Sequence, residues 1–241
     1  MFLKELPNKL KRKTMISVLC PSRGQPELAA KMVTTAIELA GADIEIILYL
    51  NDDDPKLQRY YELIDHKYIT VGPDRSPTYS WNIMASQARY EYLFLIGHDG
   101  WFETEDWAPK IVKHFDNYPD KIAFVYPSVA GLQWEGGTLT EHHAPHFCIH
   151  KNWIRALGYF LPPQFYHWYV DSWNKTIAKM IGRYHIVNDV TTPLIVELKD
   201  ELWDRKDKFC NREKDHWNWE HTQRWLNADA YALQNFIQNY K

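Results

Sequence analysis

Cysteine is scarce in this sequence. Among 241 residues there are three, Cys20, Cys148 and Cys210, and they stand far apart. An odd number at such spacing supports neither a disulfide framework nor a Cys-x-x-Cys metal site. Because Cys20 and Cys148 fall in apolar surroundings, we expect both to be buried thiols. The sequence therefore predicts a stability that does not depend on disulfides.

Long hydrophobic runs and an excess of one charge are missing as well. No apolar stretch approaches the roughly 20 residues of a membrane-spanning helix, and the first 15 residues lack the apolar core of a signal peptide. The 28 basic residues stand against 31 acidic ones, for a net charge of -3. This balance gives no global attraction to nucleic acid or to an anionic membrane, although it leaves room for a local patch. We expect a soluble, cytoplasmic protein without membrane insertion.

Internal repeats and low-complexity linkers are also absent, and the length suits one large α/β domain over residues 1–241. The amino-acid composition changes near residues 130 and 199. The segment from Lys199 to Arg224 carries seven acids and seven bases. Such mixed charge predicts an exposed helical appendage over residues 199–241.

Aromatic residues are abundant instead. They make up 15% of the chain and include 11 Trp and 15 Tyr. Rings at this density either stack on sugars or bases or fill a core with large side chains. The composition leaves both interpretations open.

Strand and helix patterns alternate along the chain. Apolar runs predict strands over residues 15–20, 44–50, 68–71, 92–96, 122–126, 147–150 and 194–198. Helical spacing of apolar residues predicts helices over residues 28–39, 107–115, 153–157 and 170–181, and a short one near residues 60–61. A further helix is expected to end at residue 88, with Thr78 or Ser80 as its N-cap. The first three strand, loop and helix units predict a mostly parallel, doubly wound sheet with helices on both faces.

The most informative stretch follows the fourth predicted strand. Residues 92–96 form too continuous an apolar run for a half-exposed strand, which predicts a parallel strand buried on both faces. Gly97 and Gly100 then allow a tight turn around a single carboxylate, Asp99. In open α/β sheets, ligands bind beyond the carboxyl ends of the strands. We therefore expect Asp99 to handle a metal ion or a phosphate.

Several segments, taken in order, carry a family resemblance. They are Ser17-Val-Leu-Cys-Pro-Ser-Arg23, the acidic cluster at 51–55, Tyr79-Ser-Trp-Asn-Ile-Met-Ala85 and Phe94-Leu-Ile-Gly-His-Asp-Gly-Trp-Phe102. Together they resemble the nucleotide-sugar half of GT-A glycosyltransferases, especially family-2-like members. Ala156-Leu-Gly-Tyr-Phe and His167-Trp-Tyr-Val-Asp-Ser-Trp173 are similar to small family-2-like enzymes of bacteriophages. The resemblance implies a nucleotide-sugar half over 14–130 and an acceptor-side half over 131–198.

The resemblance also implies a donor site. Asp52 and Asp53 would accept hydrogen bonds from uracil and ribose, unless residues 51–55 are simply a solvated turn. Arg23 and Arg75 would pair with phosphate or flank the base, and each has the alternative of an ordinary surface arginine. Ser22, Asn82 and His98 complete the residues expected to bind the donor.

The metal site departs from the family pattern. Relatives usually carry Asp-x-Asp or an Asp pair at the end of the central strand, and here His98 replaces the first acid while Asp99 matches the acid that meets Mn or Mg. Many also have a metal-binding histidine after the final strand, but residues 194–200 contain none. Either His98 substitutes, which favours manganese, or the site depends weakly on metal. His142, His143 and His146 lack structural-zinc spacing, so we expect a mobile acceptor-side loop there.

The acceptor side of the resemblance points to Asp171, which matches the family's acceptor-activating acid. Asp171 is the one carboxylate between Glu141 and Asp189, and we expect it to be the base that takes the proton from the acceptor hydroxyl. His167 is the alternative base. The competing role for Asp171 is that of a helix cap. The implied reaction is a metal-assisted, inverting transfer from a UDP-sugar.

The acceptor itself stays open at the level of sequence. Similarity to phage enzymes implies a hydroxymethylated base in phage DNA, flipped among Trp168, Tyr169 and Trp173, whereas the wider family implies a surface or lipid-linked glycan. Two other classes also remain: a nucleotidyltransferase, and a non-catalytic module that binds carbohydrate or nucleic acid.

Overall fold

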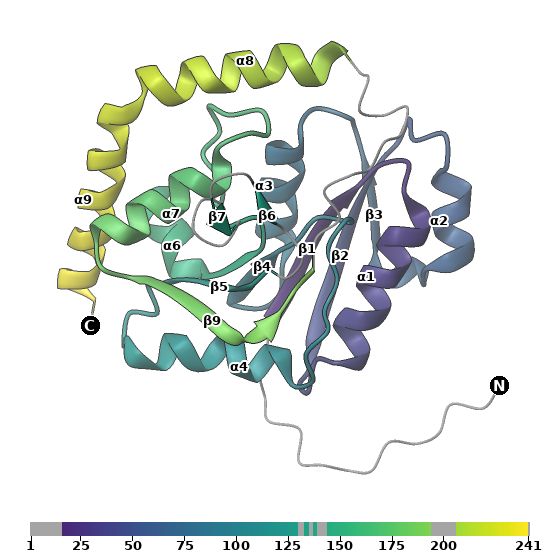
Figure 1. Cartoon of the computed structure of the whole chain (residues 1–241), viewed down its shortest axis with the longest axis horizontal. Coiled ribbons are helices and arrows are strands. Elements are labelled where there is room, and N and C mark those ends of the chain that lie inside the picture. Colours follow the sequence, from purple (N-terminus) through teal and green to yellow (C-terminus); the bar gives the residue numbers. More distant parts are fainter. Residues whose placement is uncertain (1–15, 130–132, 135–136, 139–143, 194–205, 241) are drawn as a thin grey trace.

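The structure is a computed structural model and describes residues 16–129, 133–134, 137–138, 144–193 and 206–240. A seven-stranded sheet crosses the molecule, and helices cover both of its faces (Figure 1). The strand expected over 194–198 and the histidines at 142 and 143 lie outside the described residues. In the part of the chain that is described, no helix is long and apolar enough to cross a membrane.

The sheet has the order β3-β2-β1-β4-β8-β5-β9. Its strands are β1 (Ile16–Ser22), β2 (Ile44–Asn51), β3 (Ile69–Gly72), β4 (Tyr92–Leu95), β5 (Phe124–Ser128), β8 (Phe147–His150) and β9 (Tyr184–Thr191). The pairs β1–β2, β2–β3, β1–β4 and β5–β9 are parallel, whereas β8 runs antiparallel to both β4 and β5. A short antiparallel hairpin joins β6 (Gln133–Trp134) to β7 (Gly137–Thr138).

The mostly parallel, doubly wound sheet is confirmed. Strand β4 is parallel to β1, as expected, and antiparallel to its other neighbour, β8. A strand that is buried on both faces is apolar whether its neighbours are parallel or antiparallel. The apolar run at residues 92–96 therefore does not indicate the direction of the neighbouring strand β8. Strand β9 was missed altogether. Of its eight residues only Val187 and Val190 are buried, and a spacing of three matches no strand period.

Eight α-helices are described. They are α1 (Pro26–Glu38), α2 (Leu57–Leu63), α3 (Pro77–Gln87), α4 (Trp107–Lys113), α6 (Lys151–Leu157), α7 (Val170–Met180), α8 (Lys206–His221) and α9 (Gln223–Asn239). Short 3-10 turns occur at His66–Tyr68 and His114–Asn117. The expected cap of α3 was wrong: Ser76 is the cap, and its hydroxyl oxygen accepts a hydrogen bond from Tyr79 N at 3.0 Å. Pro77 at the first helical position fixes this start.

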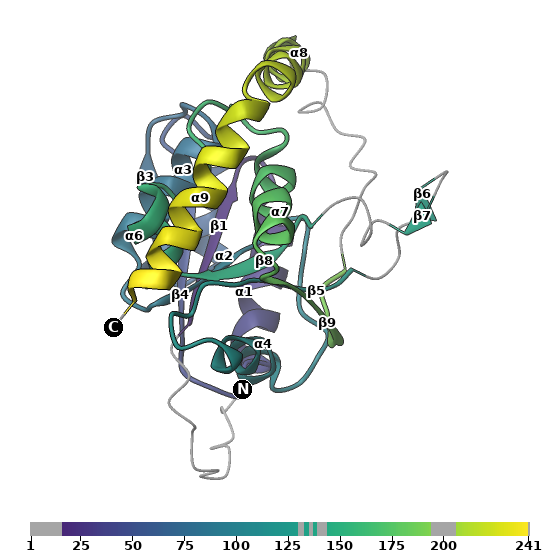
Figure 2. The ribbon, with the colours of Figure 1, turned by 90° about the vertical axis from the view of Figure 1, so that its left-hand side faces the viewer.

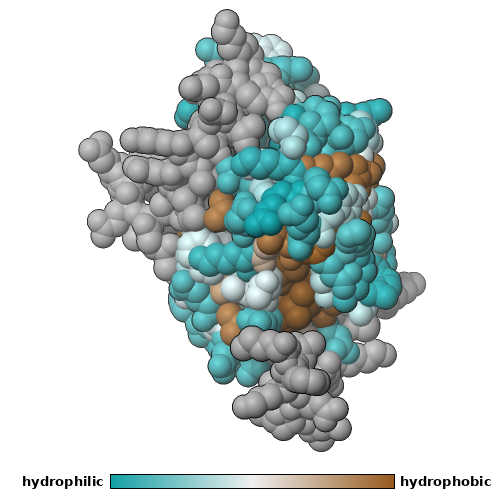
Figure 3. All heavy atoms as spheres, turned by 90° about the vertical axis from the view of Figure 1, so that its right-hand side faces the viewer, coloured by the Kyte–Doolittle hydropathy of each residue, from teal (hydrophilic) through white to brown (hydrophobic). Residues whose placement is uncertain are grey.

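Two cores lie on opposite faces of the sheet. Val18 and Phe94 belong to the core shared with α1 and α4, while their neighbours Leu19 and Leu95 belong to the core shared with α3 and α7. Such alternation follows from the two-residue period of a strand. Figure 2 shows α1 and α4 on one side of the sheet and α7 and α9 on the other. The outer face that carries α1 and α2 is mostly hydrophilic (Figure 3).

The aromatic residues and thiols mostly serve these cores. The largest fully buried side chains include three tryptophans and seven phenylalanines: Trp107, Trp153, Trp173, Phe94, Phe102, Phe115, Phe124, Phe147, Phe160 and Phe165. Cys20 and Cys148 are buried free thiols, as expected, and burial raises the pKa of both. Packing therefore accounts for much of the unusual aromatic content.

The C-terminal helices are only in part an exposed appendage. Helix α9 packs against α6 and α7 through Leu226, Ala230 and Leu233, all buried. This corrects the expectation of an exposed appendage. That expectation rested on the mixed charge of residues 199–224, which include α8, and overlooked the helical spacing of apolar residues in α9. Helix α8 is closer to the expectation, since Trp217 on its outer side is 57% exposed.

If α9 is part of the core, truncating Leu233 must be costly. We expect Leu233→Ala to lower the free energy of unfolding by about 2–5 kcal/mol, because a fully buried leucine leaves a cavity. Tyr231, two residues away and 70% exposed, is the matched control, and Tyr231→Ala is expected to change stability by less than about 0.5 kcal/mol. Urea unfolding measures both, and equal costs for the two variants would contradict the packing.

Candidate functional site

The parallel strands β1, β2, β3 and β4 bring four chain segments to one edge of the sheet. In register, Ser22 lies beside Leu50, and Asn51 lies beside Gly72. Because strand ends of the same direction meet at one edge, the segments after residues 22, 51, 72 and 95 are neighbours there. These segments carry seven of the sequence-predicted site residues: Ser22, Arg23, Asp52, Asp53, Arg75, His98 and Asp99.

Arg23 is already paired at this edge. Its guanidinium makes a bidentate interaction with Asp53, with Nη2 at 3.1 Å from Oδ2, and Nη1 lies 3.5 Å from Asp74 Oδ2. The hydrogen bond that Arg23 donates to the Asp53 carboxylate is the main cause of the raised pKa of Arg23. Asp53 is more than half exposed, whereas Arg23 is largely covered. A phosphate that approached Arg23 would therefore compete with Asp53 for the same donors.

The loops beside Arg23 are held by two groups that the sequence did not single out. Asp54 is buried, and its carboxylate accepts from Gly24 N and Lys56 N, both at 2.8 Å. The Tyr60 hydroxyl accepts from Gln25 N at 2.9 Å and lies 2.7 Å from Ser22 Oγ. Burial raises the pKa of Tyr60. Among the acids of residues 52–54 only Asp54 is buried, and nothing in the sequence separates it from its neighbours.

Asp52 and Arg75 have exposed side chains on the same edge. The backbone N–H of Asp52 donates to Gly72 O at 2.8 Å, which fixes the start of its loop. The Arg75 guanidinium carbon lies 4.9 Å from the centroid of the Tyr79 ring. Both side chains are thus accessible to a ligand, and Arg75 rests on an aromatic surface.

Asn82 has a structural task that differs from the expected donor contact. Its Nδ2 donates to Thr78 O at 3.0 Å and to Leu161 O at 2.9 Å. Its Oδ1 accepts from the N–H groups of Phe160 and Leu161, both at 3.0 Å. An amide has two donor hydrogens and two acceptor lone pairs, and all four are used here. Asn82 therefore ties α3 to the 160–161 segment instead of reaching toward a nucleotide.

The Asp99 turn is as tight as its glycines suggested. Gly100 N donates to Gly97 O at 3.2 Å. A Cβ atom on Gly97 would lie 2.3 Å from Asp99 Oδ1, and one on Gly100 would lie 2.4 Å from Cε1 and 2.6 Å from Nε2 of His146. His98 and Asp99 are both half-buried. The two glycines thus make room for the carboxylate and for an imidazole behind it.

The imidazole of His146 is buried, so the expectation of a mobile loop around this residue was wrong. His146 is 1% exposed, and its Nδ1 lies 3.1 Å from Thr192 Oγ1. Its Nε2 has no hydrogen-bond partner within the described residues. Burial lowers the pKa of His146 to about 4, against the opposing effect of the Asp99 charge. The ring is therefore neutral at neutral pH and packs against the Asp99 turn.

No cluster of three or more His, Cys, Asp or Glu side chains suited to a metal ion occurs within the described ranges. The protein side of a metal site at this turn would consist of Asp99 with His98. A carboxylate and an imidazole suit manganese, and the remaining ligands would come from a bound diphosphate and water.

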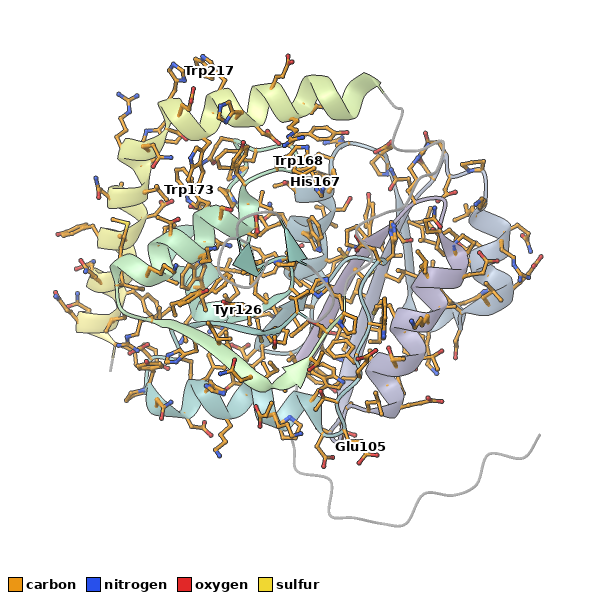
Figure 4. All side chains as sticks on the ribbon, viewed as in Figure 1. Glu105, Tyr126, His167, Trp168, Trp173 and Trp217 are labelled. Atoms are coloured by element: carbon orange, nitrogen blue, oxygen red, sulfur yellow. The ribbon has the colours of Figure 1, made fainter. Side chains whose placement is uncertain are left out.

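The aromatic loop before α7 brings His167 onto α3. The ring of His167 is nearly parallel to that of Trp81, with 6.1 Å between centroids, and meets Trp168 edge-on at 5.3 Å. The Arg212 guanidinium lies 5.0 Å from the Trp168 centroid. Figure 4 shows His167 and Trp168 beneath α8. A hydrogen bond of 3.2 Å from Thr78 N to Tyr166 O connects this loop to the start of α3.

Trp173 and Tyr169, which were also expected to surround an acceptor, pack against other parts of the protein instead. Trp173 is fully buried, and its Nε1 donates to Asp229 Oδ2 at 2.9 Å, so it belongs to the core and does not line a pocket. Tyr169 stacks on Trp219, and its hydroxyl lies 3.0 Å from His216 Nδ1. Trp168 is therefore the aromatic residue of this loop that best suits a ligand contact.

Asp171 lies in the first turn of α7, two residues beyond the cap position. Tyr169, with φ 68°, occupies the cap position. Asp171 Oδ2 accepts from Ala144 N at 3.3 Å. Two residues after Ala144 comes His146, whose ring packs against Gly100 beside Asp99. Three residues span at most about 10 Å, so one short segment joins the surroundings of Asp171 to those of Asp99.

Known proteins share this fold without close sequence similarity. No protein-family model matches the sequence, and no curated protein matches it either. The mannosyltransferase PcManGT from Pyrobaculum calidifontis, solved with GDP-Man and Mn2+, superposes with a TM-score of 0.63 at 13% identity, over 92% of this chain and 70% of that one. Residues 1–349 of S. aureus TarS, solved with UDP, give a TM-score of 0.57 at 12% identity.

These similarities establish the fold class. The chain has the GT-A glycosyltransferase fold, a mostly parallel α/β sheet followed by C-terminal helices, as the sequence predicted. The TarS match covers 75% of this chain but 60% of the TarS fragment, so this chain spans a little over half of that fragment's length.

The contact between Gly100 and His146 can be tested by a double-mutant cycle. A methyl group at position 100 overlaps the buried imidazole, so we expect Gly100→Ala to cost about 1–3 kcal/mol of stability. In a His146→Ala background the ring is gone, and the same substitution is expected to cost less than half as much. Chemical unfolding of the four proteins gives the coupling. Strictly additive costs would show that the ring lies elsewhere.

Proposed function

We propose that this protein is a glycosyltransferase that moves a sugar from a nucleotide-sugar donor to an acceptor hydroxyl. The observation that carries the proposal is the pair of carboxylates Asp99 and Asp171, joined through residues 144–146 at the carboxyl edge of a GT-A sheet. One carboxylate follows the central strand and the other begins α7 behind an aromatic loop. The UDP bound to TarS and the GDP-Man and Mn2+ bound to PcManGT support a nucleotide-sugar donor.

The donor site lies along the loops that follow β1, β2 and β3. Exposed Asp52 and Asp53 would accept hydrogen bonds from uracil and ribose, and Arg23 and Arg75 would contact the diphosphate or the base. Since Asp53 holds Arg23 in the structure, donor binding would exchange part of that ion pair for contacts to the nucleotide. We favour a UDP-sugar, by the family resemblance.

A divalent cation, manganese or magnesium, held by Asp99 with His98 would offset the negative charge that develops on the departing diphosphate. The neutral His146 behind the turn keeps the place of Asp99 without adding a positive charge that would compete with the cation. Asp99 thus has two roles in the proposal, as a metal ligand and as the charged end of a rigid turn.

Asp171 is proposed to accept the proton of the acceptor hydroxyl. As the hydroxyl oxygen bonds to the anomeric carbon, the bond from that carbon to the diphosphate breaks, with inversion. Its position in the first turn of α7 places it directly after the aromatic loop. His167, stacked on Trp81, is the alternative base.

We propose a hydroxymethylated base in phage DNA as the acceptor. Half-buried Trp168 offers a face for a flipped base, with Arg212 beside it. A surface or lipid-linked glycan is the competing acceptor. A nucleotidyltransferase and a non-catalytic binding module are the competing functions, and the following experiment separates them.

The test is a screen of nucleotide sugars with manganese that scores slow release of free nucleotide. We expect hydrolysis of a UDP-sugar by the wild-type protein and a strong loss for Asp99→Asn, together with weaker metal-dependent UDP binding in calorimetry. Glu105→Gln is the control, since Glu105 is an exposed carboxylate further along the same connection (Figure 4). No release from any nucleotide sugar, or pyrophosphate release from nucleoside triphosphates, would refute the proposal. Unchanged affinity in Asp99→Asn would move the metal site elsewhere.

The base is tested by exchanging its carboxylate for an amide. Asp171→Asn keeps the size of the side chain, so we expect donor binding to persist while sugar transfer, or hydrolysis in its place, falls by about 100-fold or more. Steady-state kinetics and calorimetry measure the two quantities. A near wild-type rate in Asp171→Asn, with loss of activity in a folded His167→Ala protein, would instead assign the base to His167.

A further inference from the structure

One carboxylate of helix α8 is inserted into the aromatic loop. Asp215 is 0% exposed. Its Oδ1 accepts from Tyr166 N at 2.7 Å, and its Oδ2 accepts from His167 N and Trp168 N, both at 2.8 Å. These three successive backbone N–H groups, which we call the 166–168 nest, converge on a residue 47 to 49 positions further along the chain.

The nest gives the loop a conformation that it would not hold alone. Three adjacent N–H groups that point to one place need an anion between them, because without one they repel each other and remain unsatisfied. A buried carboxylate is equally costly unless it is hydrogen-bonded. Asp215 and the nest therefore satisfy each other, and neither has a comparable partner in solvent once the helix is docked.

Further contacts from α8 fall on the same loop. Asn218 Nδ2 donates to Gln164 O at 2.6 Å, and His216 and Trp219 contact Tyr169. The outer side of the helix bears the exposed Trp217 and Glu213. The inner side of α8 is thus specialised for holding residues 164–169.

The loop so held carries the acceptor-side residues. His167 and Trp168 supply two of the three N–H groups, and α7 with Asp171 begins two residues after Trp168. We propose that Asp215 is a positioning residue: by filling the 166–168 nest it sets the place of His167 and Trp168 and the starting point of the helix that bears Asp171. Its consequence for activity rests on the proposed glycosyl transfer, whereas its effect on the loop does not.

The experiment uses the full-length chain and three variants. Asp215→Asn keeps the shape but turns an N–H toward the nest, Asp215→Ala empties it, and Glu213→Gln removes a nearby exposed carboxylate of the same helix as the control. Amide hydrogen exchange of residues 164–170 is measured without substrate, together with kcat and KM for hydrolysis of the UDP-sugar. Formate, added to Asp215→Ala at constant ionic strength set with chloride, is the probe for the emptied nest.

We expect exchange in residues 166–168 to become at least about tenfold faster in Asp215→Asn and Asp215→Ala, as one charge-assisted hydrogen bond is worth that much or more. Exchange in β1 and β4 is expected to stay unchanged, which shows that the fold persists. We expect kcat to fall by about 10- to 100-fold through misplacement of the base, with the donor KM within about twofold of wild type. Formate is expected to restore both exchange protection and kcat in Asp215→Ala, and Glu213→Gln is expected to match wild type.

Three results would overturn the proposal. Unchanged exchange at 166–168 in both variants would show that the nest does not depend on Asp215. Faster exchange with unchanged kcat would show that the loop does not place the reacting groups. An equal loss in Glu213→Gln would assign the effect to the charge of α8. If no nucleotide sugar is hydrolysed even by wild type, the proposed function fails, and the exchange data alone still decide whether Asp215 sets the loop.

Discussion

The site depends on the direction of one strand. Because β8 runs antiparallel to β4, with Phe147 beside Leu95, its beginning lies where β4 ends. Residues 144–146 are therefore delivered to the Asp99 turn, where the His146 ring packs against Gly100 and Ala144 N reaches Asp171. A parallel strand at this place would present its last residues instead and leave the start of α7 without a connection to the Asp99 turn.

Carboxylates that accept backbone N–H groups hold the loops around this edge. Asp54 fixes the turns at Gly24 and Lys56, Asp171 fixes Ala144, and Asp215 fixes residues 166–168. Each joins segments that are irregular and cannot satisfy their own N–H groups through a ladder or helix. Buried and half-buried acids of this protein therefore hold loops in place, whereas Asp52 and Asp53 are exposed.

The sequence predicted those parts of the fold that depend on local apolar pattern. Strands β1, β2 and β4 are continuous buried runs, and the Asp99 turn follows from a strand end with two glycines, so both were found. Strand β9 and the packing of α9 were not, since few of their residues are buried and long-range contacts decide their places. Asn82, His146 and Asp215 act through partners 46 to 79 residues away, and no local pattern encodes such pairs. For the same reason the sequence places Trp173 beside a flipped base, whereas the structure buries it fully in the core.

The strand order also has a consequence for the chain while it is being made. Strands β3, β2, β1 and β4 are complete once Leu95 has been synthesised, but the free edge of β4 has to wait for β8, which starts at Phe147. At about 5–20 residues per second, those roughly 50 residues take about 3–10 s. For that time β4, whose Leu93, Phe94 and Leu95 are buried in the folded protein, presents unpaired N–H and C=O groups along one edge, the arrangement that favours pairing with another chain. The period of greatest risk of aggregation thus falls during synthesis on the ribosome, before β8 and the helices that follow it have been made.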